Sequence, residues 1–306
     1  MQRPAKPLTP VRFRIQPPLN IMKIGIIGYG FVGKALAAGL TENVNVLKID
    51  PKLNNKISDL KDFNPDAVFI CVPTPMNKDS SQDISILFSV IKEINQLQLK
   101  TLLVLKSTVL PNHIEEIEII TKNFVYNPEF LREKHANQDF IDSQLIVFGG
   151  NKASSSALAK IYKDFTKCIC TNYIYTDPIA ASIIKYSINS FLATKVTFFN
   201  ELNSLFNQSG TNESWENFIS ALSQDSRIGI SHMHVPGHDG RFGYGGACLP
   251  KDSNAFYAYS QTKGKPLTVL KNSIKVNNKI RAKYNMQTNR EIEQNINFSN
   301  DNEENL

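Results

Sequence analysis

KIGIIGYGFVG, residues 23–33, is the stretch of sequence that decides the fold of this chain. Its apolar first half, residues 23–28, predicts a buried parallel strand, and the glycine triplet Gly28, Gly30 and Gly33 opens a helix predicted over residues 32–40. The first glycine permits a tight turn, the second leaves room for a pyrophosphate at the helix N-terminus, and the third lets helix and strand pack closely. The expected dinucleotide-binding positions are Gly28, Gly30, Phe31, Val32 and Gly33.

An acidic residue completes this pattern. A second strand is predicted over residues 44–49, and Asp50 follows it. It lies about 20 residues beyond the glycines, where a carboxylate accepts hydrogen bonds from the adenosine ribose and repels a 2′-phosphate. A glycine triplet alone is weak evidence, but strand, triplet, helix, strand and acid in this order predict an NAD site rather than an NADP site.

Composition is that of an enzyme with a full hydrophobic core. The chain has 306 residues, of which 42% are hydrophobic and 20% charged, so we expect two folded units. The net charge is +6, but the lysines are scattered among acids, and we expect no nucleic-acid partner. No apolar run approaches the ~20 residues of a membrane span, so no membrane association is expected.

The cysteines and the two ends of the chain set further expectations. Cys71, Cys168, Cys170 and Cys248 form no C-x-x-C pair, which favours reduced thiols and a cytoplasmic location. Residues 1–21 are rich in proline and are expected to form a disordered extension, with Met22 as the functional start. Residues 287–306 are rich in Asn and Glu and are expected to be a disordered tail.

Alternating strand and helix signals continue after Asp50. Residues 67–72 and 102–106 predict buried strands that end in polar turns, and Thr74 and Thr108 lie in those turns. In a doubly wound parallel sheet, ligands bind beyond the carboxyl ends of the strands. Both threonines are therefore candidates for contact with cofactor or substrate, with ordinary turn threonines as the alternative. The fold class is α/β, a Rossmann-type sheet over residues 22–177.

Two later segments carry charged residues in apolar surroundings. After a strand at 124–126, Pro128 predicts a helix start that would place Glu129 and Glu133 one turn apart on one face; the alternative is that both acids only stabilise the helix. A long helix over residues 178–208 places Lys185 and Asn189 on one face within an apolar stripe. A lysine there is either snorkelling or functional.

GYGGACLPKD, residues 243–252, is the third candidate segment. Its glycines allow close approach to a ligand, and Lys251 near Cys248 is expected to lower the pKa of the thiol and favour a thiolate nucleophile. The alternative is a turn with a small buried cysteine. Histidines at 232, 234 and 238 lack the cysteines or acids that would complete a zinc site, so no metal is expected.

Eight motifs in order resemble the UDP-glucose/GDP-mannose dehydrogenase family: GYGFVG, Asp50, CVPTP, STVLP, YNPEFLRE, K-x-x-x-N, DSRIG and FGYGGACLPKD. The resemblance implies oxidation of the C6 alcohol of a nucleotide sugar by two NAD, with UDP-glucose giving UDP-glucuronate. GDP-mannose, a UDP-N-acetylhexosamine, or a catalytically weak NAD-binding subunit that needs a partner remain alternatives. Family members carry a further unit that closes over the uridine diphosphate, and nothing here matches it.

The resemblance also implies roles for single residues. Cys248 resembles a nucleophile that forms a thiohemiacetal and then a thioester, Lys185 a cation at the oxyanion, and Glu129 a base that activates water. The other implied catalytic residues are Asn189, Asp252 and Thr108. The implied cofactor contacts beyond the glycine turn and Asp50 are Thr74, Thr108, Glu133 and Lys251. The implied substrate contacts are Glu129, Phe130, Leu131, Lys185, Asn189, Arg227, Tyr244 and Gly245.

Assembly follows from the same comparison. Arg227 resembles an arginine that reaches a neighbouring subunit's substrate, and the long apolar helix needs a cover. We therefore expect a homodimer through a helical dimerisation unit over residues 178–286.

Overall fold

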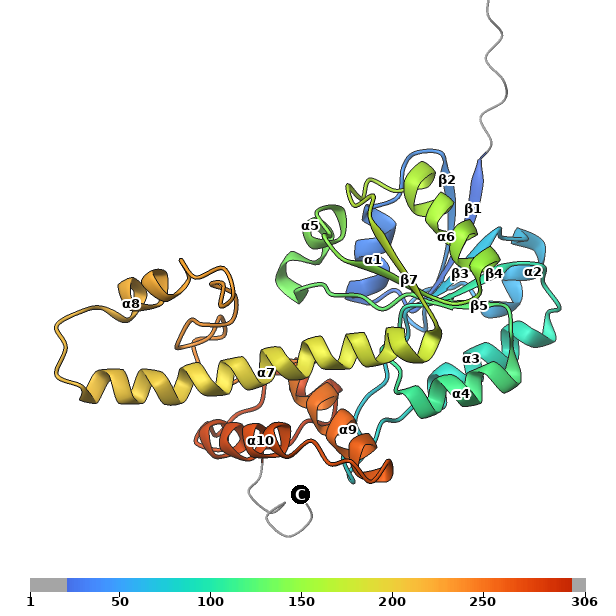
Figure 1. Cartoon of the computed structure of the whole chain (residues 1–306). Helices are drawn as coiled ribbons and strands as arrows, with labels where there is room; N and C mark the ends of the chain where they lie inside the picture. Colours follow the sequence, from blue (N-terminus) through green and yellow to red (C-terminus); the bar gives the residue numbers. More distant parts are fainter. Residues whose placement is uncertain (1–20, 299–306) are drawn as a thin grey trace, which may run out of the picture.

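The computed structural model describes residues 21–298 and contains a seven-stranded, mostly parallel sheet in the order β2-β1-β3-β4-β5-β6-β7 (Figure 1). The strands are β1 (Met22–Ile27), β2 (Val44–Ile49), β3 (Ala67–Ile70), β4 (Leu102–Leu105), β5 (Phe124–Tyr126), β6 (Ile146–Gly149) and β7 (Tyr173–Thr176). Strands β1 to β5 run parallel to one another. Strand β6 is antiparallel to β5, and β7 is parallel to β6. The predicted Rossmann-type fold is confirmed, with its last two strands reversed.

Helices cover both faces of this sheet. They are α1 (Phe31–Ala38), α2 (Leu60–Phe63), α3 (Ser85–Gln96), α4 (Pro111–Ile120), α5 (Ala136–Ile141) and α6 (Lys152–Phe165), with short 3-10 turns η1 (Ile57–Asp59) and η2 (Glu133–His135). Side chains alternate across the strands, so Val68 packs with α2, α3 and α4 while Phe69 packs with α1, α5 and α6. Two apolar cores result, one on each face of the sheet.

A long helix leads out of the sheet unit. α7 (Pro178–Gln208) has the predicted bounds, because Asp177 caps it through Ala180 N at 2.8 Å and Pro178 is suited to its first turn. α9 (Leu249–Thr262) and α10 (Thr268–Arg281) pack along one side of α7, and α8 (Trp215–Leu222) lies near its far end (Figure 1). None of the helices within residues 21–298 is long and apolar enough to cross a membrane.

The predicted disordered tail is corrected for residues 287–298. This segment contains α11 (Asn289–Glu293), and its Glu291 is fully buried against Arg281. Ile296 and Phe298 form a small apolar cluster with Met76. Few apolar residues suffice because an ion pair anchors the segment. Residues 299–306 and the predicted extension 1–20 lie outside the described residues.

One local prediction was also wrong. No helix begins at Glu129, because its carbonyl accepts a hydrogen bond from Lys185 and the nearby Arg132 N donates to Asp139. Glu129 and Glu133 therefore do not share a helix face.

Candidate active site

The glycine turn after β1 has the geometry of a dinucleotide-binding turn. Gly28 has φ +87°, and a Cβ there would lie 2.6 Å from the Cys71 carbonyl oxygen. A Cβ at Gly33 would lie 2.3 Å from the Gly28 carbonyl oxygen, whereas nothing lies within 4 Å of a Cβ at Gly30. Gly30 is the N-cap residue of α1, whose first turn has no acidic residue. These residues fit a pyrophosphate at a helix N-terminus.

Asp50 is fixed beside this turn. Its Oδ2 accepts a hydrogen bond from Tyr29 N at 2.8 Å, and its Oδ1 accepts one from Lys52 N at 3.0 Å. The carboxylate therefore lies at the carboxyl end of β2 next to the glycines, where the adenosine ribose of a dinucleotide binds.

The turns after β3 and β4 are joined to each other. Thr74 Oγ1 donates to the Thr108 carbonyl oxygen at 2.9 Å. Gln82 donates to the same oxygen at 2.7 Å and to the Tyr186 hydroxyl at 2.9 Å, which ties both turns to α7. Gln82 was missed by the sequence analysis, because a glutamine in a polar loop carries no recognisable signal.

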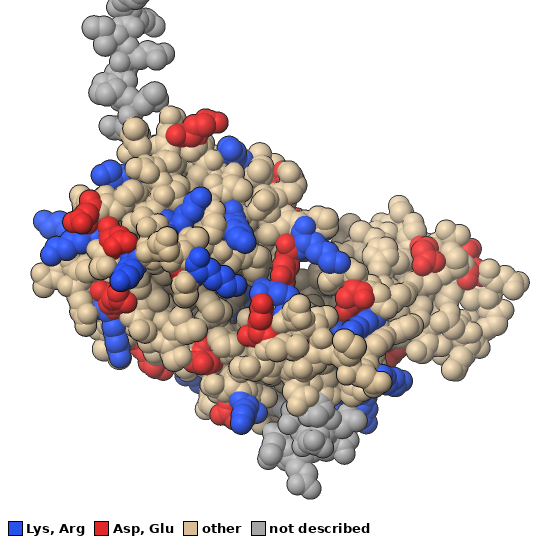
Figure 2. All heavy atoms as spheres, turned by 180° about the vertical axis from the view of Figure 1, so that it is seen from behind, with Lys and Arg blue, Asp and Glu red and all other residues tan. Residues whose placement is uncertain are grey.

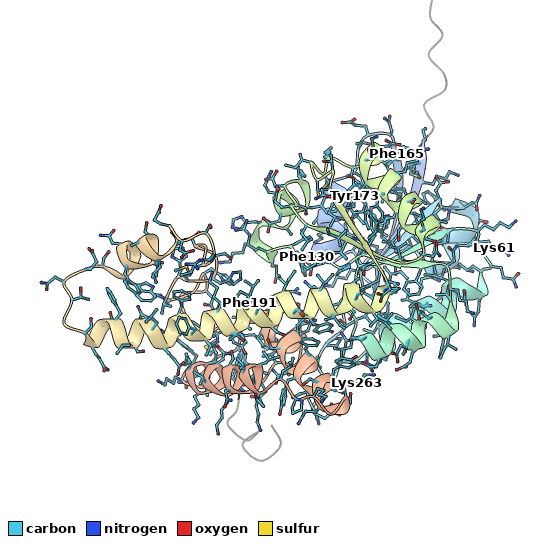
Figure 3. The ribbon with its side chains drawn as sticks, viewed as in Figure 1. Lys61, Phe130, Phe165, Tyr173, Phe191 and Lys263 are labelled. Atoms are coloured by element: carbon cyan, nitrogen blue, oxygen red, sulfur yellow. The ribbon has the colours of Figure 1, made fainter. Side chains whose placement is uncertain are left out.

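Lys185 and Glu129 form a buried ion pair. Lys185 Nζ donates to the Glu129 carbonyl oxygen at 2.5 Å and lies 3.2 Å from Oε1; the two side chains are 3% and 6% exposed. Glu129 Oε2 accepts from Leu131 N at 2.6 Å, and the Phe130 ring lies 5.2 Å from Lys185 Nζ. Figure 3 shows Phe130 between the sheet unit and α7. Four residues predicted from two distant segments thus meet.

Electrostatics keep Lys185 charged. Burial alone would lower its pKa, but the negative charges of Glu129 and Asp252 outweigh burial and raise the pKa above its usual value. An ammonium group that is protonated at neutral pH and shielded from water is suited to stabilise an oxyanion.

A second buried network lies one turn further along α7. Asn189 Nδ2 donates to Asp252 Oδ2 at 2.6 Å, and Lys251 Nζ contacts Asp252 Oδ1 at 2.5 Å. Asp252 is 1% exposed and lies in the first turn of α9. The predicted polar residues of α7 and α9 are therefore brought together.

Cys248 occupies the N-cap position of α9 and is half-buried. Burial, then Glu129 and Asp252, raise its pKa to about 11, and these effects outweigh the opposite influence of Lys251 and Lys185. Lys251 does lower the pKa, as expected, but the expected net result, a thiolate in the free chain, is wrong. The side chain of Cys248 is a thiol at neutral pH.

The glycine-rich loop before Cys248 is anchored on α10. Tyr244 N donates to Asn277 Oδ1 at 2.7 Å, and Asn277 Nδ2 donates back to the Tyr244 carbonyl oxygen at 3.0 Å. Tyr244 is buried, and a Cβ on Gly245 would lie 2.2 Å from Arg281 Nη2. Tyr244 and Gly245, both predicted substrate contacts, are therefore held against Asn277 and Arg281 of α10.

Two predicted residues lie apart from this cluster. Arg227 is 86% exposed and pairs with Asp225 in its own loop at 2.5 Å. Glu133 lies 2.7 Å from Arg290 Nε rather than beside Glu129.

A second buried lysine was missed. Lys106 follows β4, is 3% exposed, and donates to Asn127 Oδ1 at 3.0 Å and to the Tyr162 hydroxyl at 3.2 Å. Burial lowers its pKa from 10.5 to about 8. Since Asn127 lies two residues before Glu129, Lys106 helps to fix the turn that carries Glu129. The signal was present as a lysine ending an apolar strand run.

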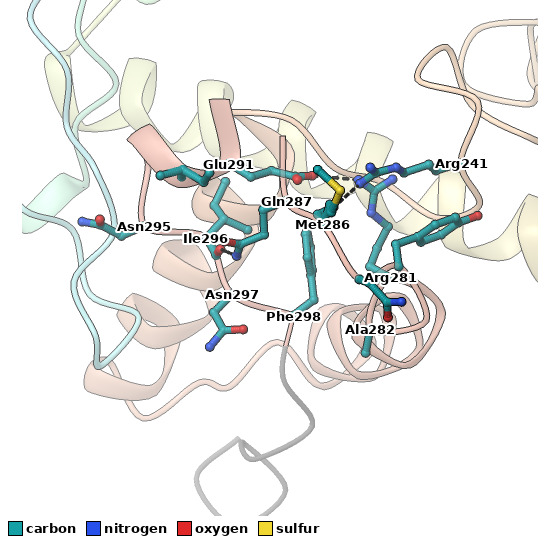
Figure 4. A pocket seen from close by; sticks show the side chains of 13 residues that line it. Arg241, Arg281, Ala282, Met286, Gln287, Glu291, Asn295, Ile296, Asn297 and Phe298 are labelled. Carbon is teal, nitrogen blue, oxygen red and sulfur yellow. Dashed lines mark hydrogen bonds and ion pairs between the residues drawn. The ribbon is translucent and has the colours of Figure 1, made fainter. Parts of the chain in front are cut away.

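A cavity of about 620 Å³ is lined in part by Arg281, which contacts the glycine-rich loop before Cys248 (Figure 4). It lies between α10, α11 and the residues after them, and its lining includes Arg241, Arg281, Tyr284 and Glu291. Within residues 21–298, no group of three or more His, Cys, Asp or Glu could hold a metal ion.

Comparison with known proteins places this geometry in a family. The family model described as the NAD binding domain of the UDP-glucose/GDP-mannose dehydrogenase family matches residues 60–166, and the central-domain model matches residues 179–279. This chain belongs to that family. The family's members are nucleotide-sugar dehydrogenases, and this chain, like them, binds NAD.

Individual relatives have the same family name. A UDP-glucose 6-dehydrogenase of Rickettsia bellii is 38% identical over 197 residues, covering 62% of this chain and 44% of that protein. One of Rickettsia prowazekii is 33% identical over 303 residues, covering 84% and 67%. A solved UDP-glucose dehydrogenase of Pyrobaculum islandicum is 25% identical with a TM-score of 0.73, covering 86% and 69%. The chain spans about half the length of several curated relatives that it matches, 44 to 46% for three Rickettsia proteins.

Proposed function

We propose that this chain performs the NAD-dependent oxidation of the C6 alcohol of UDP-glucose to the carboxylate of UDP-glucuronate. The observation that carries the proposal is the buried Lys185–Glu129 pair, with Nζ and Oε1 3.2 Å apart, together with a cysteine at the N-cap of α9 whose pKa both residues influence. An alcohol dehydrogenase that stops at the aldehyde needs a cation but no thiol. A thiol lets the same site oxidise the aldehyde, because it adds to the carbonyl and restores a transferable hydride.

In the first half-reaction, Lys185 stabilises the alkoxide formed at C6. NAD, when bound along the glycine turn, accepts a hydride in each of the two oxidations. Cys248 then adds to the aldehyde, and the Lys185 ammonium faces the oxygen that becomes negative. Because the pKa of Cys248 is raised to about 11, its proton leaves only as the carbon–sulfur bond forms and passes to the former carbonyl oxygen, which gives a thiohemiacetal. Transfer of the second hydride from C6, with loss of the hydroxyl proton to water, turns this adduct into a thioester.

The last step is hydrolysis of the thioester. Glu129 takes a proton from the attacking water, and Thr108 helps to hold that water. The carbon–sulfur bond then breaks, and Cys248 leaves as a thiolate that takes up the proton from Glu129. Glu129 Oε1 lies 3.2 Å from Lys185 Nζ, so base and cation act on the same carbon from adjacent positions. Asn189 and Asp252 hold ordered water, and Asp252 keeps Lys251 in place.

The active species is a homodimer in the cytoplasm. Phe191, Phe198 and Leu205 repeat every seven residues on one side of α7 and are 58 to 68% exposed. Figure 3 places Phe191 on the side of α7 away from α9 and α10. Lys195 holds the loop of Arg227 against α7 through the Ile228 carbonyl at 2.8 Å. A second copy covering this face would meet Arg227, which then contacts the partner's substrate.

Other nucleotide sugars remain a second candidate for the substrate. A solved GDP-mannose dehydrogenase of Pseudomonas aeruginosa is also 25% identical to this chain, with a TM-score of 0.58.

Figure 2 shows basic and acidic side chains interspersed over the sheet unit on one face, with no extended basic region there that would favour a polymeric phosphate.

Cys248→Ser tests the proposal. The variant should bind NAD as the wild type does but lose uronate formation by about two or more orders of magnitude, because serine is a poorer nucleophile at neutral pH. The measurement is NADH absorbance with a panel of nucleotide sugars. Near wild-type uronate formation by Cys248→Ser would reject the thioester route.

A further inference from the structure

The residues after α10 fold back over the glycine-rich loop of residues 243–248, which we call the cysteine loop. We call residues 287–298 the C-terminal strap. Its helix α11 starts with a capping box in which Glu291 Oε2 accepts from Thr288 N at 2.7 Å and Thr288 Oγ1 accepts from Glu291 N. This turn directs Glu291 inward, where its side chain has no exposed surface.

Glu291 is bound to the loop that carries Cys248. Its Oε1 accepts from Gly246 N at 3.1 Å and from Arg281 Nη2 at 2.7 Å (Figure 4 shows Glu291 and Arg281). Arg281 is equally buried and also pairs with Asp239 at 2.8 Å. A carboxylate without exposed surface is tolerated only when its charge is compensated, so each partner fixes the others.

The loop backbone lies directly on this ion pair. A Cβ at Gly245 would lie 2.4 Å from Glu291 Oε1, and Gly246 has φ +77°. Cys248 follows two residues later, at the N-cap of α9. The path of the backbone into Cys248 is thus set on one side by α9 and on the other by a carboxylate from the strap.

The strap also contacts the NAD-binding unit. Arg290 lies 2.7 Å from Glu133 and stacks 5.7 Å from the centre of the Phe31 ring, the first residue of α1. Asn295 donates to the Met76 carbonyl oxygen at 3.1 Å. One short segment therefore bridges the cofactor turn and the cysteine loop.

We propose that Glu291 is a positioning residue: it sets the conformation of the Gly245–Cys248 backbone, and the strap keeps that loop in register with the cofactor turn. The inference rests on the proposed role of Cys248 as nucleophile. The central-domain match ends at residue 279, so the strap lies beyond the part of the chain that the family models cover.

Glu291→Gln tests this role, because it keeps the size of the side chain and removes the charge that holds Arg281. Glu293→Gln is the matched control, since Glu293 lies on the same helix, is 55% exposed and, among the ion pairs of residues 21–298, pairs only with Arg290. Three quantities are measured: alkylation of Cys248 by iodoacetamide relative to Cys71, the Kd for NAD, and kcat with UDP-glucose. Glu291→Asp serves as the conservative variant.

We expect Glu291→Gln to alkylate several-fold faster at Cys248 while Cys71 stays protected, and kcat to fall by about one to two orders of magnitude with the Kd for NAD unchanged. Glu291→Asp should recover part of kcat, and Glu293→Gln should match the wild type. Equal Cys248 alkylation and kcat in Glu291→Gln and wild type would overturn the proposal.

If Glu291→Gln fails to fold, a measurement on the wild-type chain still tests the proposal. Hydrogen exchange should show the Gly246 amide protected to the same degree as the α9 backbone, and rapid exchange there would also overturn the proposal. If the wild type oxidises no nucleotide sugar, the proposed function fails, yet alkylation and exchange still decide whether Glu291 positions the loop.

Discussion

At the scale of single residues, the reactivity of Cys248 is set by everything packed around it rather than by the lysine three positions later. Burial and two carboxylates raise its pKa to about 11, although two lysines oppose them. A chemist reading only the local sequence would expect an activated thiolate. In the folded chain Cys248 is instead a thiol at neutral pH, and the proposed reaction requires it to lose its proton as it adds to the aldehyde.

This thiol has a measurable pH signature. The rate of Cys248 alkylation in the free enzyme should rise about tenfold per pH unit and continue rising beyond pH 9, because the thiolate fraction grows until the pH reaches the pKa. The rate is followed by mass spectrometry, with glutathione as the control thiol. A plateau of Cys248 near that of glutathione would contradict the raised pKa.

We expect Asp50 to select NAD over NADP. Asp50→Ser should weaken NAD and strengthen NADP binding, narrowing the difference in affinity, because the repulsion of the 2′-phosphate is removed. Calorimetry with both dinucleotides measures the two Kd values. Asp62→Ser removes an exposed acid from α2 and should leave the ratio unchanged. An unaltered ratio in Asp50→Ser would show that other groups select NAD.

At the scale of elements, the buried Lys106 at the carboxyl end of β4 lowers the free energy of unfolding when it is charged. Its pKa falls from 10.5 to about 8 in the folded chain, so between these pH values the unfolded chain binds more protons. The lysine therefore costs the fold most below pH 8, and this cost disappears as the pH rises toward 10.5.

Lys106→Met tests this sign. The difference in free energy of unfolding between variant and wild type should be about 3 kcal/mol more favourable to the variant at pH 6 than at pH 10.5. Urea unfolding at several pH values measures it. Lys160→Met, which removes an exposed lysine from α6, is the control and should show no such trend. A pH-independent difference for Lys106→Met would contradict the lowered pKa.

Elements with a strong local pattern were predictable from the sequence. The bounds of β2 and α7 agree with the prediction, and the glycine turn has the predicted geometry. The segment after Pro128 was not predictable, because Lys185 binds the Glu129 carbonyl from another element and prevents a helix. The order of the strap depends on a long-range ion pair with Arg281, which no periodicity reveals.

The sequence predicts which residues line the candidate site but not which other residues they contact. Glu129, Lys185, Asn189, Asp252 and Cys248 meet as expected, because strand ends and helix faces bring such positions together. Their charge states depend on burial, which the sequence does not report. Gln82, Lys106 and Glu291 act through contacts with distant elements, so no local motif identifies them.

At the scale of the whole molecule, the exposed face of α7 predicts the assembly. Phe198→Glu should dissociate the dimer, because it places a charge in the centre of the apolar face. Light scattering measures the mass. Ile119→Glu is the matched control, since Ile119 is 84% exposed on α4. A Phe198→Glu chain that remains dimeric would show that α7 is not the interface.

Exchange between inactive variants tests completion of the site by the partner. Arg227→Ala and Cys248→Ser chains, mixed and allowed to exchange, should recover about a quarter of wild-type activity, because half of the dimers hold one intact site. No recovery after verified subunit exchange would mean that Arg227 acts within its own chain.

The most direct test of the four-electron account is the number of NADH formed per nucleotide sugar, measured together with the fate of Cys248. With limiting UDP-glucose, the wild type should form about two NADH per sugar, and Glu129→Gln should give a burst of NADH followed by slow turnover, with a sugar adduct on Cys248 in mass spectrometry. One NADH per sugar, with free aldehyde released and Cys248 unmodified, would contradict the account.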